Sequence, residues 1–143
     1  MDMPRVLLIC SLISIIGTVS CNLQNNAGNK SLSDNFMVRV AEIEIEDGYI
    51  EEYLSILSEE AEASVRLEKG VICIYPMYQA KNPSQIRLLE IYASQEAYEA
   101  HLQTPHFKHY KTSTQHMVKS LRLIDMESID PGSMSQIFRK LGH

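Results

Sequence analysis

Hydrophobic residues change their spacing several times along residues 36–130, and these changes restrict the chain to a mixed α and β fold. Residues 36–46 (FMVRVAEIEIE) carry apolar side chains at alternating positions, which predicts a strand. Residues 49–68 carry them at every third or fourth position, with acidic residues on the remaining positions, which predicts an amphipathic helix. Gly70 follows Lys69, as is typical of a helix C-terminus.

The second half of this region predicts two further strands, a broken helical stretch and a last strand. Ser94 is suited to cap a helix, and Thr104-Pro105 is typical of a helix start, so the chain should begin a new helix there. Lys81 to Ser84 are expected to form a turn. The expected elements are strands over residues 71–80 and 85–93, helices over residues 95–103 and 105–117, and a strand within residues 118–129.

This order of elements, β-α-β-β-α-β, predicts an α+β, ferredoxin-like fold with an antiparallel sheet. In the usual strand order of that fold, 4-1-3-2, the second strand lies at an edge, where Pro76 is tolerated because one side of the strand is unpaired. Helices should cover one face of the sheet. The other face is expected to carry Val38, Val40, Ile86, Leu88 and Tyr92. Because exposed apolar faces favour a partner, we expect a sheet-to-sheet homodimer.

The 143-residue chain has room for one domain, which we place at residues 36–130. A turn at Asp130-Pro131-Gly132 should close it, and the tail over residues 131–143 is expected to be helical around residues 134–141.

The first twenty residues resemble an export signal. An uncharged apolar run, residues 6–17 (VLLICSLISIIG), is shorter than the ~20 residues of a membrane span. Thr18-Val19-Ser20-Cys21 then resembles a bacterial lipoprotein cleavage box, so we expect residues 1–20 to be removed and Cys21 to carry the lipid. Cleavage without a lipid and an uncleaved anchor are the alternatives. Residues 21–35 are mostly polar and are expected to form a flexible tether to the cell envelope.

Charge and motifs exclude several classes of function. The net charge is −5 and no basic patch is present, so the chain is not expected to bind nucleic acid. Nucleophile-elbow, P-loop and dinucleotide-binding motifs are also missing from the sequence. Cys73 lies in an apolar strand pattern, which favours a buried, inert thiol over a catalytic one.

Candidate site residues are densest between Glu90 and Phe107. Glu90 and Tyr92 are two residues apart on one strand and so share a face, while His101 and His106 flank the helix break. A histidine can remove a proton from a phenol near neutral pH, and the resulting anion is electron-rich enough to react with oxygen.

Structural roles for the same residues remain open. Glu90 would then pair with Arg87, Arg122 or a partner subunit, and Tyr92 would be a core aromatic residue. The two histidines would pin the helix break to the sheet. His106 and His109 could share a helical face, but no third residue completes a familiar metal motif, so no metal site is expected.

The run Glu90-x-Tyr92, Glu96-Ala97-x-x-x-His101 and Thr104-Pro105-His106-Phe107 resembles the signature of the antibiotic-biosynthesis monooxygenase family. The resemblance implies a dimeric α+β barrel that oxidises quinols or phenols with molecular oxygen, without a metal, flavin or other cofactor. It implies a catalytic set and a substrate-binding set of residues. These are catalytic His101, His106 and Tyr92, and substrate-binding Glu90, Phe107, Tyr75 and Tyr78.

Two features separate the chain from branches of that family. The sequence contains no Trp, which the oxygenase and haem-degrading branches often place at the position of Tyr92. Lys111 stands near the place of the iron-binding histidine of the haem branch, so haem degradation is disfavoured. The Thr-Pro-His pattern is closer to a branch that processes a phosphorylated autoinducer-2 intermediate. Three hypotheses follow: a cofactor-independent quinol or phenol monooxygenase, an isomerase of a small sugar-derived signalling molecule, and a non-catalytic binding module.

Overall fold

The computed structural model describes residues 36–130 and 132–142. The predicted signal, the lipidation site at Cys21 and the tether lie outside these residues. The elements along the chain are β1 (Met37–Ile45), the short 3-10 helix η2 (Asp47–Tyr49), α1 (Ile50–Leu67), β2 (Val71–Gln79), β3 (Asn82–Tyr92), α2 (Gln95–His101), α3 (Pro105–Thr114), β4 (Val118–Met126) and α4 (Gly132–Leu141).

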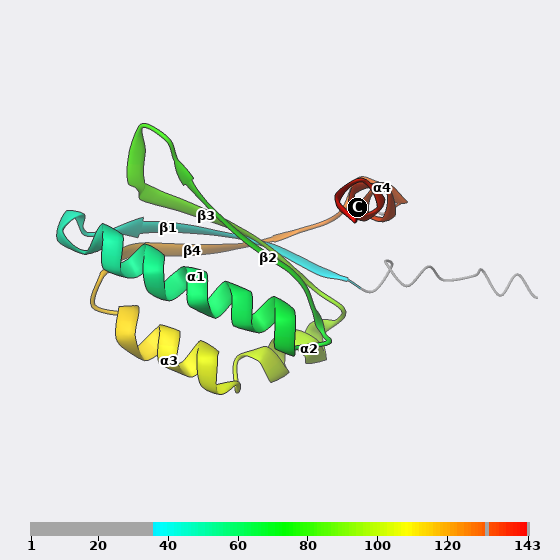
Figure 1. Ribbon diagram of the computed structural model, residues 1–143, viewed down its shortest axis with the longest axis horizontal. Coiled ribbons are helices and arrows are strands. Elements are labelled where there is room, and N and C mark those ends of the chain that lie inside the picture. Colours follow the sequence, from blue (N-terminus) through cyan, green and yellow to red (C-terminus); the bar gives the residue numbers. More distant parts are fainter. Residues whose placement is uncertain (1–35, 131, 143) are drawn as a thin grey trace, which may run out of the picture.

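The four strands form one antiparallel sheet in the order β2-β3-β1-β4, which confirms the predicted ferredoxin-like fold. Helices α1, α2 and α3 form a layer on one face of the sheet, and α4 lies apart from them (Figure 1). We call the face beneath α1, α2 and α3 the covered face, and the opposite one the outer face. As expected, β2 is an edge strand and contains Pro76.

The hydrophobic core lies between the covered face and α1. Alternate residues of β1 and β3 supply the sheet side, and α1 supplies large side chains that are almost completely buried, such as Tyr53 and Leu57. The core residues of the two central strands are Ala41, Ile43, Ile45, Ile86, Leu88 and Tyr92. Burial of this apolar surface is the main stabilising contribution for a domain of this size.

The predicted outer face was wrong for three residues, because Ile86, Leu88 and Tyr92 lie on the covered face. The register explains this: Leu88 pairs with Ala41 and Ile86 with Ile43, so each pair points to the same side. Neighbouring positions therefore form the outer face. Its apolar residues on the two central strands are Val38, Val40, Leu89 and Ile91.

The hairpin between β2 and β3 is tighter than expected. The predicted turn at Lys81 to Ser84 was wrong, since the turn consists of Ala80 and Lys81, and β3 already begins at Asn82. Pro83 is tolerated there because β1 pairs with β3 only from Gln85 onward, which leaves the first residues of β3 without a neighbour on that side.

The helix break at Pro105 is confirmed. Thr104 caps α3, with its hydroxyl oxygen accepting a bond from the Phe107 backbone N–H at 3.3 Å. The second helix ends at Thr114 rather than at 117, because Met117 leaves the helix and is buried in the core. The tail is helical, as predicted, and α4 buries none of its described residues. Within residues 36–130 and 132–142, no helix has the length and apolar character needed to cross a membrane.

Candidate functional site

A cavity of about 230 Å³ lies between the covered face and helices α2 and α3. Strand residues form its floor, and its roof comes mainly from the end of α2 and the first turns of α3. The residues that line it are Arg39, Ala41, Ile43, Glu60, Ile74, Leu88, Glu90, Tyr92, Tyr98, His101, Leu102, Phe107, Tyr110, Lys111, Leu121 and Leu123. The walls are mostly apolar and aromatic, with a few ionisable groups, as is usual for sites that bind small molecules.

Four of the predicted site residues meet in this cavity, namely Glu90, Tyr92, His101 and Phe107. His106 is not part of its wall but contacts the same network of side chains as His101.

Two predicted binding residues lie elsewhere. Tyr75 is 60% exposed and, being paired with Leu89, lies on the outer face. Tyr78 is 55% exposed and lines a separate hollow beside α1. The alternation of β2 and the length of its hairpin carry both tyrosines away from the cavity.

Glu90 is the ionisable group of the cavity floor without a hydrogen-bond partner among the residues that the structure describes. Burial raises the pKa of Glu90 to about 7, although the nearby Arg39 guanidinium opposes the rise. Pairing of Glu90 with Arg87 or Arg122, the predicted structural alternative, is not found, because both arginines contact Glu42 on the outer face. The carboxyl is therefore free to face a ligand.

Arg39 places a positive charge beside Glu90, because the two residues are directly opposite on β1 and β3. Its guanidinium lies 2.6 Å from Asp125 and stacks 4.6 Å from the centre of the Tyr98 ring. With only 11% of its side chain exposed, Arg39 is held in a defined position at the cavity wall.

Tyr92 combines the two roles considered from the sequence. It is almost completely buried and packs against the rings of Tyr98 and His101, with centroid distances of 5.3 and 5.5 Å. Burial raises the pKa of its hydroxyl well above the usual value, so the phenol stays neutral. Tyr92 is thus a core aromatic residue that also forms part of the cavity wall.

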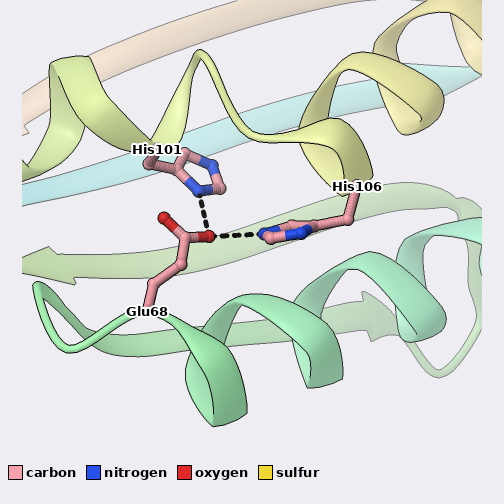
Figure 2. Close-up of side chains that lie close together, drawn as sticks. All are labelled: Glu68, His101 and His106. Carbon is pink, nitrogen blue, oxygen red and sulfur yellow. Dashed lines mark hydrogen bonds and ion pairs between the residues drawn. The ribbon is translucent and has the colours of Figure 1, made fainter.

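The two histidines share one carboxylate oxygen (Figure 2). His101 Nδ1 lies 3.0 Å from Oε1 of Glu68, and His106 Nε2 lies 2.6 Å from the same oxygen. On the other side of the His101 ring, Nε2 lies 3.7 Å from Oε1 of Glu60, which accepts a bond from the Ser64 hydroxyl at 2.8 Å. Glu68 and the two imidazoles therefore form a hydrogen-bonded network, which Glu60 adjoins through its longer contact with His101.

The two carboxyl groups of this network have different affinities for protons. Burial raises the pKa of Glu60, and the bond from Ser64 opposes that rise. Burial would also raise the pKa of Glu68, but hydrogen bonds from His101 and His106 outweigh it, and the pKa is lowered. The inner carboxyl thus holds a proton more readily than the outer one.

Local sequence brings the members of the network together. Glu68 is the C-cap of α1, and Gly70 follows it closely. A side chain at Gly70 would meet the Cβ of Ala97 at 2.6 Å, so glycine is needed for α2 to pack against this turn. Thr104 fixes the other side, since its hydroxyl donates to the His101 carbonyl at 2.8 Å while it caps α3.

Sequence reasoning did not single out Glu60, Glu68 or Arg39. Glu68 and His101 are 33 positions apart, and only the packing of α1 against the end of α2 joins them. The short run Glu68-Lys69-Gly70 before a strand was the one local signal, because the glycine marks a close approach of the backbone.

The ligand atoms of Glu68, His101 and His106 lie within 4.8 Å of one another, which is compatible with a bound cation. The prediction of no metal site was based on the spacing of the histidines and did not take Glu68 into account. Because both ring nitrogens lie at hydrogen-bond distance from a single oxygen, 2.6 and 3.0 Å, we interpret the group as a hydrogen-bonded network.

A larger hollow, of about 510 Å³, lies on the outer face beside α4. Its walls come from the outer face, such as Val38 and Ile91, and from α4 residues such as Met134. Its acidic residues, Glu127 and Asp130, are on the exposed segment after β4. Because no buried ionisable group converges on it within the described residues, the cavity on the covered face is the better candidate for chemistry.

Comparison with known proteins agrees with this architecture. Residues 36–113 match the family model described as antibiotic biosynthesis monooxygenase. A crystal structure from Bacteroides thetaiotaomicron, of a protein proposed to be such a monooxygenase, is 45% identical, with a TM-score of 0.69, and the match covers 70% of this chain and 95% of that one.

A second solved structure, a proposed monooxygenase from Lactobacillus acidophilus, is 32% identical with a TM-score of 0.64 over 66% of this chain and 45% of that one. A third, from Nitrosomonas europaea and proposed to be an antibiotic biosynthesis monooxygenase, is 17% identical with a TM-score of 0.64 over 68% and 93% of the two chains, and supports the fold alone. No curated protein gives a significant match. From the family match and the 45% identical relative, we conclude that the chain belongs to the antibiotic biosynthesis monooxygenase family.

Proposed function

We propose that this protein is a cofactor-independent monooxygenase that oxidises a quinol or another small phenol with molecular oxygen. The observation that carries the proposal is the unpartnered carboxyl of Glu90, which lies on the floor of an apolar cavity and has a pKa raised to about 7. A base with a pKa near the working pH is well suited to accept a phenolic proton.

The chemistry balances with oxygen as the sole co-reactant. The substrate hydroxyl gives its proton to Glu90, and the electron-rich ring carbon then forms a bond to oxygen. Loss of the ring proton and cleavage of the O–O bond give a quinone carbonyl, while the second oxygen atom takes up two protons and leaves as water. These equal the two protons that the hydroxyl and the ring carbon release. The ring is oxidised and oxygen is reduced, so a metal or flavin is not required to supply electrons.

The remaining cavity residues would bind and orient the substrate. Tyr92 and Phe107 present aromatic surfaces, and the Arg39 guanidinium stabilises negative charge that develops near Glu90. A cavity of about 230 Å³ is smaller than the ~300–1,000 Å³ of most ligand sites, which favours a substrate of one or two rings.

His101 would orient the substrate rather than act as the first base. Both of its ring nitrogens face carboxyl oxygens, at 3.0 Å from Glu68 and 3.7 Å from Glu60, so the ring would orient the substrate as part of the cavity wall. The role of base, which the sequence suggested for a histidine, thus moves to Glu90.

We also propose that the protein is a homodimer bound to the cell envelope. The apolar residues Val38, Val40 and Leu89 on the outer face support dimerisation, because such a face is stabilised when a second copy covers it. The Thr-Val-Ser-Cys21 sequence supports export and a lipid anchor. Mass spectrometry of the protein purified from membranes, compared with a Cys21→Ser variant, tests the anchor.

Oxygen consumption tests the proposed function. We expect the chelator-treated protein to consume oxygen with at least one quinol or naphthol faster than autoxidation does. Glu90→Gln keeps the size of the side chain but cannot accept the proton, so the rate should fall by about 100-fold. His109→Ala, on the exposed surface of α3, is the matched control. Substrate conversion without oxygen would contradict the proposal and support an isomerase, and saturable binding without turnover would support a binding module.

A further inference from the structure

A line of four ionisable side chains runs from the cavity towards the protein surface. Glu60 lines the cavity, His101 lies next to it, Glu68 follows, and His106 is the outermost member. The exposed fraction of the side chain rises along most of this line, from 5% for Glu60 and 3% for His101 to 14% for Glu68 and 19% for His106. The line therefore joins a buried site to solvent through groups that can each gain and lose a proton.

We propose that Glu60, His101, Glu68 and His106 form a proton relay between the cavity and solvent, which returns a proton to the oxygen atom that leaves during oxidation. This inference rests on the proposed function. It assigns a role to four side chains that do not take part in the removal of the substrate proton by Glu90. Glu90 removes the substrate proton on the floor of the cavity, and Glu60 supplies a proton from the side of α1.

Each transfer breaks one bond to hydrogen and forms another. Glu60 gives its proton to the leaving oxygen, which departs as water. His101 Nε2–H then passes a proton to Glu60, while Nδ1 receives one from Glu68. Glu68 obtains that proton from His106 Nε2–H, and His106 Nδ1 takes up a proton from solvent. One proton has then moved inward, and both imidazoles carry their hydrogen on Nδ1 until each returns to the Nε2–H tautomer before the next turnover. Glu90 releases the substrate proton to solvent at the end of the cycle, so the protons balance, and no electron is transferred along the relay.

The geometry supports transfer at the two contacts of Glu68. The contacts of Glu68 with the two rings, 3.0 and 2.6 Å, are already hydrogen bonds. The contact between His101 Nε2 and Glu60 is 3.7 Å, longer than a hydrogen bond. The relay requires it to shorten when a ligand fills the site, as catalytic hydrogen bonds often do. The bond from Ser64 keeps the Glu60 carboxyl beside the His101 ring.

Proton affinities along the relay agree with this direction. Burial raises the pKa of Glu60, so the inner carboxyl holds a proton more readily than an ordinary glutamate does. The pKa of Glu68 is lowered by its two imidazole partners against the effect of burial, so it holds a proton less readily than an ordinary glutamate does. One carboxyl is thus adapted to store a proton and the other to pass it on.

A purely structural network would tie the end of α1 to the junction of α2 and α3, and this is the competing interpretation. The structural role and the relay predict different effects when the side chain of His106, the outermost group, is removed. If the network is only structural, its loss loosens the junction and exposes His101. If it is a relay, its loss isolates His101, which is 2% exposed, from solvent.

The first experiment measures exchange of the His101 ring N–H protons with solvent by NMR, in the full chain and without substrate. In His106→Ala and Glu68→Gln we expect exchange to slow by about tenfold or more, since the proton path is cut. His109→Ala, on the same helix but outside the network, should exchange like the wild type. Unchanged or faster exchange in His106→Ala would overturn the relay, and this outcome does not depend on any enzymatic activity.

The second experiment uses the substrate identified by oxygen consumption. His106→Ala should lose about tenfold in kcat and regain it with added imidazole, because a small base can replace the missing group at the surface. Glu68→Gln should not be rescued. Normal turnover in both variants would overturn the relay while leaving the proposed function intact. If the wild type consumes no oxygen with any substrate, the proposed function fails, and the exchange measurement alone decides whether the relay exists.

Discussion

The covered and outer faces of the sheet are formed by the same strands but place their charged residues in different environments. On the covered face, Arg39 and Glu90 lie among core residues, and burial raises the pKa of Glu90 to about 7. On the outer face, charged residues such as Glu42 and Glu44 remain near solvent and form ion pairs with arginine and lysine. Because neighbouring residues in a strand point to opposite sides, a shift of one position separates a buried carboxyl with a raised pKa from an ordinary surface charge.

The largest expected difference between the faces concerns stability. Ile86→Ala removes a fully buried side chain from the covered face and should lower the free energy of unfolding by about 2–5 kcal/mol. Met77→Ala, on the outer face and 43% exposed, should change it by about 0.5 kcal/mol or less. Urea denaturation of both variants checks the comparison, and similar losses would mean that the faces are not different in packing.

Charge on the outer face should affect assembly rather than folding. Leu89→Glu places a carboxylate in the centre of the proposed dimer contact, where a buried unpaired charge is costly. We expect the dimer to dissociate to monomers that keep the wild-type circular dichroism spectrum. Light scattering coupled to size-exclusion chromatography measures the mass. A wild type that is already monomeric would contradict the proposed sheet-to-sheet contact.

The raised pKa of Glu90 predicts how stability depends on pH. Its carboxyl has a pKa of about 7 when folded, against the ordinary value of 4.5, so the folded state binds more protons between these values. Its contribution to stability is therefore fully present below about pH 4.5 and is lost as the pH rises towards 7. Glu90→Gln should remove this part of the dependence. Unfolding titrations at several pH values test this, and parallel curves for the two proteins would show that Glu90 does not titrate in that range.

The smallest expected effect is that of an ion pair on the outer face. Lys119 lies 2.8 Å from Glu44, and its side chain is 57% exposed. Lys119→Ala should change the free energy of unfolding by less than about 1 kcal/mol, and less still at high salt. Thermal unfolding at low and high salt measures this. A loss comparable to that of Ile86→Ala would mean that the outer-face charges carry more of the stability than their exposure implies.

Local patterns predicted the parts of the fold that depend on neighbouring residues. The alternation in β1, the apolar stripe of α1 and the Thr104-Pro105 cap each specify an element by themselves, and the structure contains all three. The faces of β3 were assigned incorrectly, because Ile86 to Tyr92 is apolar on both sides and its pattern alone does not say which side meets the helices.

For the candidate site, too, the sequence predicted only the residues that lie close together in the chain. Glu90, Tyr92, His101 and Phe107 are close in the sequence, and the fold brings them to one cavity. Glu60 and Glu68 come from α1, and their contact with His101 depends on how α1 packs against the end of α2. In the sequence they are two acidic residues in an acidic helical segment, and the residues next to them do not distinguish a buried glutamate from a solvated one.

The shared oxygen of Glu68 has a consequence for how variants of this site combine. Loss of either His101 or His106 leaves the carboxylate with one remaining partner, whereas loss of both leaves a half-buried charge with none. The two single replacements therefore do not add: the double variant should be less stable than their sum indicates. Single substitutions would for this reason underestimate the contribution of both residues to stability. A double-mutant cycle measures the interaction energy between them.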